Sequence, residues 1–131
     1  MYALLPVHSI VRWLVVIVAV VAVVKFAIGW LRGSAFTGMD RGLASAFSGL
    51  MDLQALLGII MLIGFSINEG VPMVRIEHST TMLIAVVLGH LPARWKKAAD
   101  SIRFRNTMFC IIGALLFVYV GVMRLPGGWS R

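Results

Sequence analysis

The three histidines of this chain are its most chemically suggestive residues, because each lies at or inside the boundary of an apolar run. Ionisable groups are costly at such positions in lipid, which makes them functional candidates. His8 opens the first apolar run and His78 opens the third. If both runs are helices that point the same way, the two imidazoles lie at similar depth and can ligate one haem iron from opposite sides. We therefore predict His8 and His78 as metal ligands.

Two arginines accompany this predicted pair. Arg12 follows His8 by four residues, so both side chains share one helix face. Arg75 lies about one turn before His78. Guanidinium groups form charge-assisted hydrogen bonds with carboxylates, so both arginines are candidates to hold haem propionates. A single boundary histidine more often caps a helix or meets headgroups, but the matched pair favours haem.

His90 occupies a different position. It follows His78 by twelve residues, which is about 18 Å along a helix axis and about 120° around it. A second haem at that depth would lack a second histidine, and Met51 or Met108 would be only a weak ligand. Such methionines more often pack, so we expect one haem. His90 is then a further contact to the cofactor, to a quinone carbonyl or to the adjacent loop.

Lys25 and Asp52 are two further charged residues within the apolar runs. A lone carboxylate in lipid is protonated or finds a partner. We predict that Lys25 pairs with Asp52 across the interface of the first two helices. A structural pair is favoured here over a proton or quinone site.

The composition indicates that the solvent of this chain is lipid. Of 131 residues, 60% are hydrophobic and 13% are charged, against about 45–50% and about 25% in soluble domains. A soluble core of this size could not hide so many apolar side chains. The composition excludes a disordered tail, a disulfide-rich miniprotein and most soluble enzymes. The single cysteine, Cys110, excludes an intrachain disulfide and a covalent Cys-x-x-Cys-His haem attachment.

The basic residues predict the orientation. Twelve Lys and Arg against five Asp and Glu give a net charge of +7. Most of the cations gather in two gaps between apolar runs, Arg32 to Arg41 and Arg94 to Arg105. This positive-inside pattern predicts that these gaps face the cytoplasm and that both termini lie on the outer side. The pattern is not the basic stripe of a nucleic-acid-binding protein, and the first residues lack the charged start of a signal peptide.

Four apolar runs predict an all-α fold with four transmembrane helices in an up-down bundle. The runs are Ile10–Trp30, Leu43–Ile67, Ser79–Leu91 and Thr107–Val122. The third is short unless it begins a turn earlier, at Arg75. Backbone groups in lipid must be bonded internally, and these runs lack the alternation of a barrel strand. We expect one domain, residues 1–131, that crosses the inner membrane of a bacterium several times.

Several short motifs resemble those of the small four-helix bacterial membrane proteins described as cytochrome b-like. The motifs are His8-Ser9 with Arg12-Trp13, Gly29-Trp30, Asp40-Arg41, Leu53-Gln54 with Leu57-Gly58, Glu77-His78 with Met82, Gly89-His90 and Lys96-Lys97. The resemblance spans nearly the whole chain. It implies haem b and electron transfer, with His8 and His78 as the matching histidines. Some members of that family have a histidine in the second helix beside the Leu-Gln step, where this chain has Asp52, so a second haem is not expected.

The function expected from the sequence is that of an electron-transfer subunit rather than a stand-alone enzyme. It would hold one haem b and exchange electrons with a quinone or a larger redox or photosynthetic complex, as a partner of that complex or as a homo-oligomer. Two alternatives remain open. The histidines can each ligate a magnesium chlorin, which would make the chain a chlorophyll-binding accessory subunit. The chain can also be a cofactor-free structural or assembly subunit whose histidines are boundary residues.

Overall fold

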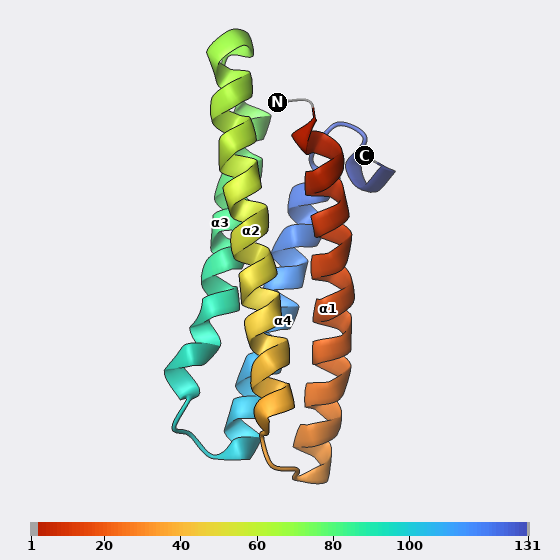
Figure 1. The fold of residues 1–131 in the computed structure, drawn as a ribbon, viewed down its shortest axis with the longest axis vertical. Helices are drawn as coiled ribbons and strands as arrows, with labels where there is room; N and C mark the ends of the chain where they lie inside the picture. Colours follow the sequence, from red (N-terminus) through yellow and green to blue (C-terminus); the bar gives the residue numbers. More distant parts are fainter. Residues whose placement is uncertain (1–2, 131) are drawn as a thin grey trace.

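Four long α-helices joined by short connections make up residues 3–130, the part of the chain that the computed structural model describes (Figure 1). They are α1 (Leu4–Arg32), α2 (Gly38–Glu69), α3 (Met73–His90) and α4 (Asp100–Met123), with short 3-10 helices η1 (Leu91–Trp95) and η2 (Gly128–Ser130). No strand occurs among the described residues, so the predicted all-α class is confirmed.

The ends of the helices follow from local chemistry. Thr37 begins α2 through a capping box, in which its backbone N–H donates to Asp40 Oδ2 at 2.8 Å. Gly33 ends α1 in the left-handed conformation, with φ of 64°, which a residue without a Cβ adopts readily. Gly70 and Pro72 separate α2 from α3, because proline cannot continue a preceding helix.

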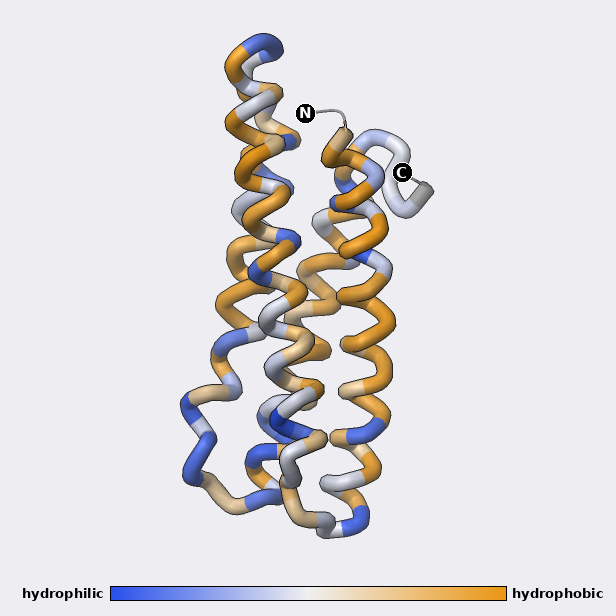
Figure 2. Tube along the Cα trace, viewed as in Figure 1, coloured by the Kyte–Doolittle hydropathy of each residue, from blue (hydrophilic) through white to orange (hydrophobic). Residues whose placement is uncertain are grey.

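The helices run alternately up and down, and each packs against its neighbours in the chain while α4 closes back on α1 (Figure 1). α1 and α3 are consequently diagonal to each other. We call the end that holds the α1–α2 and α3–α4 connections the connection end, and the opposite end, near both chain termini, the terminal end. Figure 2 shows hydrophobic stretches along the helices and hydrophilic segments gathered at the connection end.

The outer surfaces of the bundle are apolar. α1, α2 and α4 are each long and apolar enough to cross a membrane, and large side chains such as Ile17, Ile63 and Leu116 lie exposed on them. α3 has 18 residues, or about 27 Å of helix, which is slightly less than the roughly 30 Å of a hydrocarbon core. These apolar surfaces are consistent with a multi-pass membrane protein, while the fourth span stays a prediction.

The predicted pair of Lys25 with Asp52 is wrong. Lys25 Nζ instead bonds Asp40 Oδ1, and Asp52 Oδ1 bonds His90 Nε2 at 2.7 Å. The cause is the start of α2, which begins at Gly38 rather than at Leu43. Asp40 is therefore helical and level with Lys25, whereas Asp52 lies fourteen residues into α2, about 21 Å from its start.

The two acidic residues should differ in their effect on stability. Asp40 is 1% exposed and accepts bonds from both Lys25 and Thr37, while the Lys25 side chain is 36% exposed, so Asp40→Asn breaks a partly buried ion pair and weakens a helix cap. We expect it to lower the free energy of unfolding by about 2 kcal/mol. Asp52→Asn alters an exposed pair and can keep a hydrogen bond to His90, so its cost should be about 0.6 kcal/mol. Thermal unfolding in detergent measures both variants; an equal loss would contradict the observed pairing.

Candidate functional site

A cavity of about 480 Å³ opens between the four helices in the terminal half of the bundle. Each helix contributes one stripe of side chains, spaced three or four residues apart. Among the lining residues are Leu5, His8, Arg12 and Val15 of α1; Gln54, Gly58, Met61, Leu62 and Phe65 of α2; Arg75, His78, Ser79, Met82 and Val86 of α3; and Val118 and Val122 of α4. A volume of this size is within the range of small-molecule and cofactor sites, about 300–1,000 Å³. We call it the histidine cavity.

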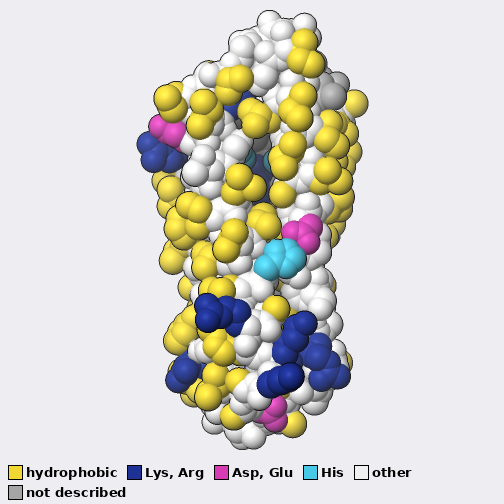
Figure 3. Space-filling model, turned by 90° about the vertical axis from the view of Figure 1, so that its left-hand side faces the viewer, with side chains coloured by type: hydrophobic (Ala, Val, Ile, Leu, Met, Phe, Trp, Pro, Cys, Tyr) yellow, Lys and Arg dark blue, Asp and Glu magenta, His cyan; other side chains and the backbone are white. Residues whose placement is uncertain are grey.

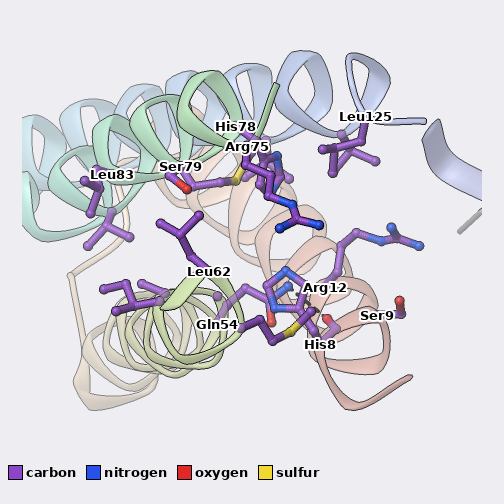
Figure 4. A pocket seen from close by; sticks show the side chains of 18 of the residues that line it. His8, Ser9, Arg12, Gln54, Leu62, Arg75, His78, Ser79, Leu83 and Leu125 are labelled. Atoms are coloured by element: carbon purple, nitrogen blue, oxygen red, sulfur yellow. Dashed lines mark hydrogen bonds between the residues drawn. The ribbon is translucent and has the colours of Figure 1, made fainter. Parts of the chain in front are cut away.

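His8 and His78 both line this cavity, and both are half-buried. His8 comes from α1 and His78 from α3, and Figure 4 shows their side chains reaching into the space between these helices. Because α1 and α3 are diagonal in the bundle, the two rings approach the cavity from opposite walls. This arrangement suits a flat ligand held from both faces.

The ring of His78 is oriented by the backbone of α4. Its Nδ1 lies 3.1 Å from the carbonyl oxygen of Gly121. A carbonyl only accepts, so Nδ1 carries a hydrogen in this bond. Histidines that ligate metals usually donate their other ring N–H in this way.

Gly121 permits the close approach of α3 to α4. A Cβ at Gly121 would lie 2.2 Å from Met82 Cε and 3.7 Å from His78 Nδ1. Contacts under 3.0 Å do not occur between real Cβ atoms and their neighbours, so any larger residue would move Met82, which lines the cavity.

α2 supports the other histidine. Gln54 Nε2 donates to the backbone carbonyl of His8 at 2.9 Å, which ties α2 to α1 beside the site. One turn along α2, a Cβ at Gly58 would lie 3.5 Å from His8 Cε1, so this glycine faces the ring at ordinary contact distance. Gln54 Oε1 is buried and, among the described residues, has no hydrogen-bond partner. The cavity wall therefore also presents a buried amide acceptor.

Both predicted arginines line the cavity, at its terminal end (Figure 4). Arg12 is 7% exposed, and its guanidinium carbon lies 5.4 Å and 5.2 Å from the ring centroids of Trp13 and Trp129. Arg75 donates to Glu69 Oε2 at 2.8 Å. Positive charge near a buried site attracts anionic groups strongly, because the low-dielectric surroundings screen it poorly.

The cavity is amphipathic. Its terminal end carries the histidines, the arginines and Glu69, whereas its deeper part is bounded by Met51, Val86 and Val118. Figure 3 shows the surface of this face hollowed in its terminal half, with hydrophobic side chains around the opening. A largely apolar ligand with a polar or anionic edge fits such a cavity.

His90 lies outside the histidine cavity. It bonds Asp52 on the exposed surface between α2 and α3 and lines a second cavity near the connection end. Met51 and Met108, considered as weak ligands, are both buried in the hydrophobic core, as packing methionines are. The structure thus brings together four of the five predicted site residues and leaves His90 apart.

Among the described residues, no group of three or more His, Cys, Asp and Glu side chains could hold a bare metal ion. A haem iron needs only axial ligands from the protein, because the macrocycle supplies the other four nitrogens. Two imidazoles that line one cavity are the kind of axial ligands that a tetrapyrrole iron would need.

The chain matches no family model, no curated protein and no solved structure. The resemblance to cytochrome b-like membrane proteins therefore stays a prediction.

Sequence reasoning missed Gln54, Gly121 and Trp129 as parts of the site. The sequence could have indicated Gln54, because an amide inside an apolar run needs a hydrogen-bond partner. Nothing in the sequence indicates Gly121 or Trp129, because their roles come from contacts with distant segments, α3 and α1.

The hydrogen bond from His78 to Gly121 leads to a prediction for the ligand-free protein. ¹⁵N NMR of histidine-labelled protein should show a hydrogen on Nδ1 of His78, with the signal assigned from a His78→Gln variant. His90 serves as an internal comparison, because it bonds a carboxylate through Nε2. A His78 ring with no hydrogen on Nδ1 would contradict the observed bond to Gly121.

Proposed function

We propose that this chain is a membrane cytochrome b-like subunit that binds one haem b between His8 and His78 and transfers electrons. The observation that supports it most is that two histidines from diagonal helices line one amphipathic cavity together with two arginines. The apolar depth of the cavity matches a porphyrin, and the arginines at its edge match propionates. His78 would bind through Nε2, because Nδ1 is engaged by Gly121.

In this proposal the chain positions the haem and surrounds it with apolar side chains, and the bound haem would supply reversible one-electron chemistry at iron. The diagonal helices hold two imidazoles on either side of the site, and Gln54 and Gly121 fix the segments that carry them. Arg12 packs beside two indole rings that contact each other, Trp13 and Trp129, and would present its cation to a carboxylate. The surrounding aliphatic side chains exclude water.

The proposed orientation follows from the basic residues at the connection end. Arg41, Lys96 and Arg105 are among them, and the positive-inside rule assigns that end to the cytoplasm of a bacterial inner membrane. The haem would then lie near the outer face, beside both termini. Because the cavity opens between helices, a quinone or a subunit of a larger redox complex could approach its edge from the membrane and act as the electron partner.

Haem binding by purified protein tests the proposal. The chain is expressed with haem supplied, and a reduced-minus-oxidised absorption spectrum is recorded. We expect a b-type signal at about one haem per chain, lost or strongly weakened in both His8→Ala and His78→Ala. His90→Ala is the control and should keep the signal, because His90 does not line the histidine cavity. No haem in the unaltered chain, or equal loss in all three variants, would overturn the proposal. Pigment extraction identifies a chlorin if one is bound instead.

A matched pair of glycine variants tests the shape of the cavity. Gly121→Ala pushes Met82 Cε from its place in the cavity wall, whereas a Cβ at Gly113 meets only Leu88 Cδ1, at 3.4 Å. We expect Gly121→Ala to weaken haem binding, because the flexible Met82 side chain must shift within the cavity wall, and Gly113→Ala to leave it nearly unchanged. Haem titration of the two apo-proteins measures the difference. Equal affinities would show that Gly121 does not shape the site.

A further inference from the structure

A second cavity, of about 360 Å³, lies at the connection end. It is bounded by the first turns of α2, by η1 and by the start of α4, and it shares no lining residue with the histidine cavity. We call it the basic cavity. The proposed haem site makes no use of it, and the following inference does not depend on haem.

Three cations line the basic cavity: Arg41 of α2, Lys96 beside η1 and Arg103 of α4. Within residues 3–130, none of them belongs to a salt bridge, and no Asp or Glu lines the cavity. Asp40, beside Arg41 in sequence, is already engaged by Lys25 and Thr37. Three cations that converge without an acid leave an uncompensated positive potential, which favours an anionic ligand.

Arg103 is held in place for such a ligand. Its guanidinium carbon lies 4.1 Å from the ring centroid of Phe36. Phe36 is itself buried and packs against Phe26 and Phe104, with ring centroids 5.7 Å and 4.9 Å away. A guanidinium fixed on a ring keeps its N–H edge available and loses little side-chain freedom on binding an oxyanion.

Hydroxyl groups complete the set of donors. Thr107 lies one turn after Arg103 on α4 and is 3% exposed, and Ser45 contributes from α2. Phosphate accepts several hydrogen bonds at once and pairs with arginine in a bidentate manner. The chemistry of this donor set is therefore that of a phosphate site.

We propose that the basic cavity binds the phosphate of an anionic phospholipid. Basic cavities between membrane helices are suited to anionic headgroups. The apolar surface beside the cavity argues for a lipid rather than free phosphate. Val87, one turn before the cavity-lining His90, is 64% exposed, and Ile102, next to Arg103, is 37% exposed. Acyl chains would cover these side chains while the headgroup phosphate lies among the cations.

Lipid titration of the full chain in detergent tests this. Phosphatidylglycerol and phosphatidylcholine with identical acyl chains are added separately, and the thermal unfolding midpoint and the bound lipid, by native mass spectrometry, are measured. We expect saturable stabilisation by phosphatidylglycerol, with about one lipid per chain, and little effect of phosphatidylcholine. Arg103→Gln should weaken phosphatidylglycerol binding about tenfold, as loss of a charge-assisted pair does. Arg105→Gln, on the same helix but outside the cavity, should not.

A second pair of variants keeps the test decisive if Arg103→Gln does not fold. Lys96→Gln should weaken phosphatidylglycerol binding, whereas Lys97→Gln, equally exposed but not lining the cavity, should not. Equal binding of the two lipids, or equal losses in Lys96→Gln and Lys97→Gln, would overturn the proposal. Inorganic phosphate alone is the third arm. If it stabilises the chain as much as phosphatidylglycerol does, the cavity recognises free phosphate and the assignment to lipid is wrong.

Discussion

Uneven filling of the bundle is the constraint on which the rest of this structure depends. Toward the connection end the interior is filled by four buried phenylalanines, Phe26, Phe36, Phe47 and Phe104. Their rings pack so closely against the backbone that a Cβ at Gly29 would lie 2.6 Å from Phe104. In the terminal half, smaller residues such as Gly58, Val118 and Val122 face the interior, and the histidine cavity opens between them. Close packing in one half thus coexists with a hollow in the other.

The filled half also fixes the helices that carry the histidines. α1 and α4 meet along a stripe of Val15, Ala19, Ala22 and Phe26 in the core, which brings their axes close. The Lys25–Asp40 pair joins α1 to the start of α2 at the same end. With the helices set there, α1 and α3 remain diagonal along their length, and His8 and His78 reach one space from opposite sides. The geometry of the site is a consequence of packing that occurs far from it.

Much of the fold could be predicted from the sequence because lipid leaves few alternatives. Long apolar runs must be helices, and short connections make consecutive helices antiparallel. From that alone His8 and His78 fall at similar depth, and the structure brings both to one cavity with Arg12 and Arg75. The prediction of similar depth depends only on the direction of each helix, so it holds even when the start of a helix is misplaced by several residues.

The pairing of Lys25 could not be predicted in the same way, because it depends on helix register. Asp40 was placed in a connection, but the capping box at Thr37 starts α2 before it and places its carboxylate opposite Lys25. An error of five residues in that start moves a side chain by about 7 Å along the axis, enough to exchange one partner for another. The hydrogen bond between His78 and the Gly121 carbonyl could not be predicted either, because the residues near position 121 do not indicate which segment packs against them.

Electron paramagnetic resonance of the ferric, haem-loaded chain at low temperature tests the central claim most directly, because the spin state of iron depends on its axial ligands. Two imidazoles, one from each diagonal helix, predict a low-spin six-coordinate signal that becomes high-spin when either His8 or His78 is replaced by alanine. A high-spin signal in the unaltered chain, or a low-spin signal that survives replacement of one of these histidines, would contradict the convergence of the two side chains on one iron.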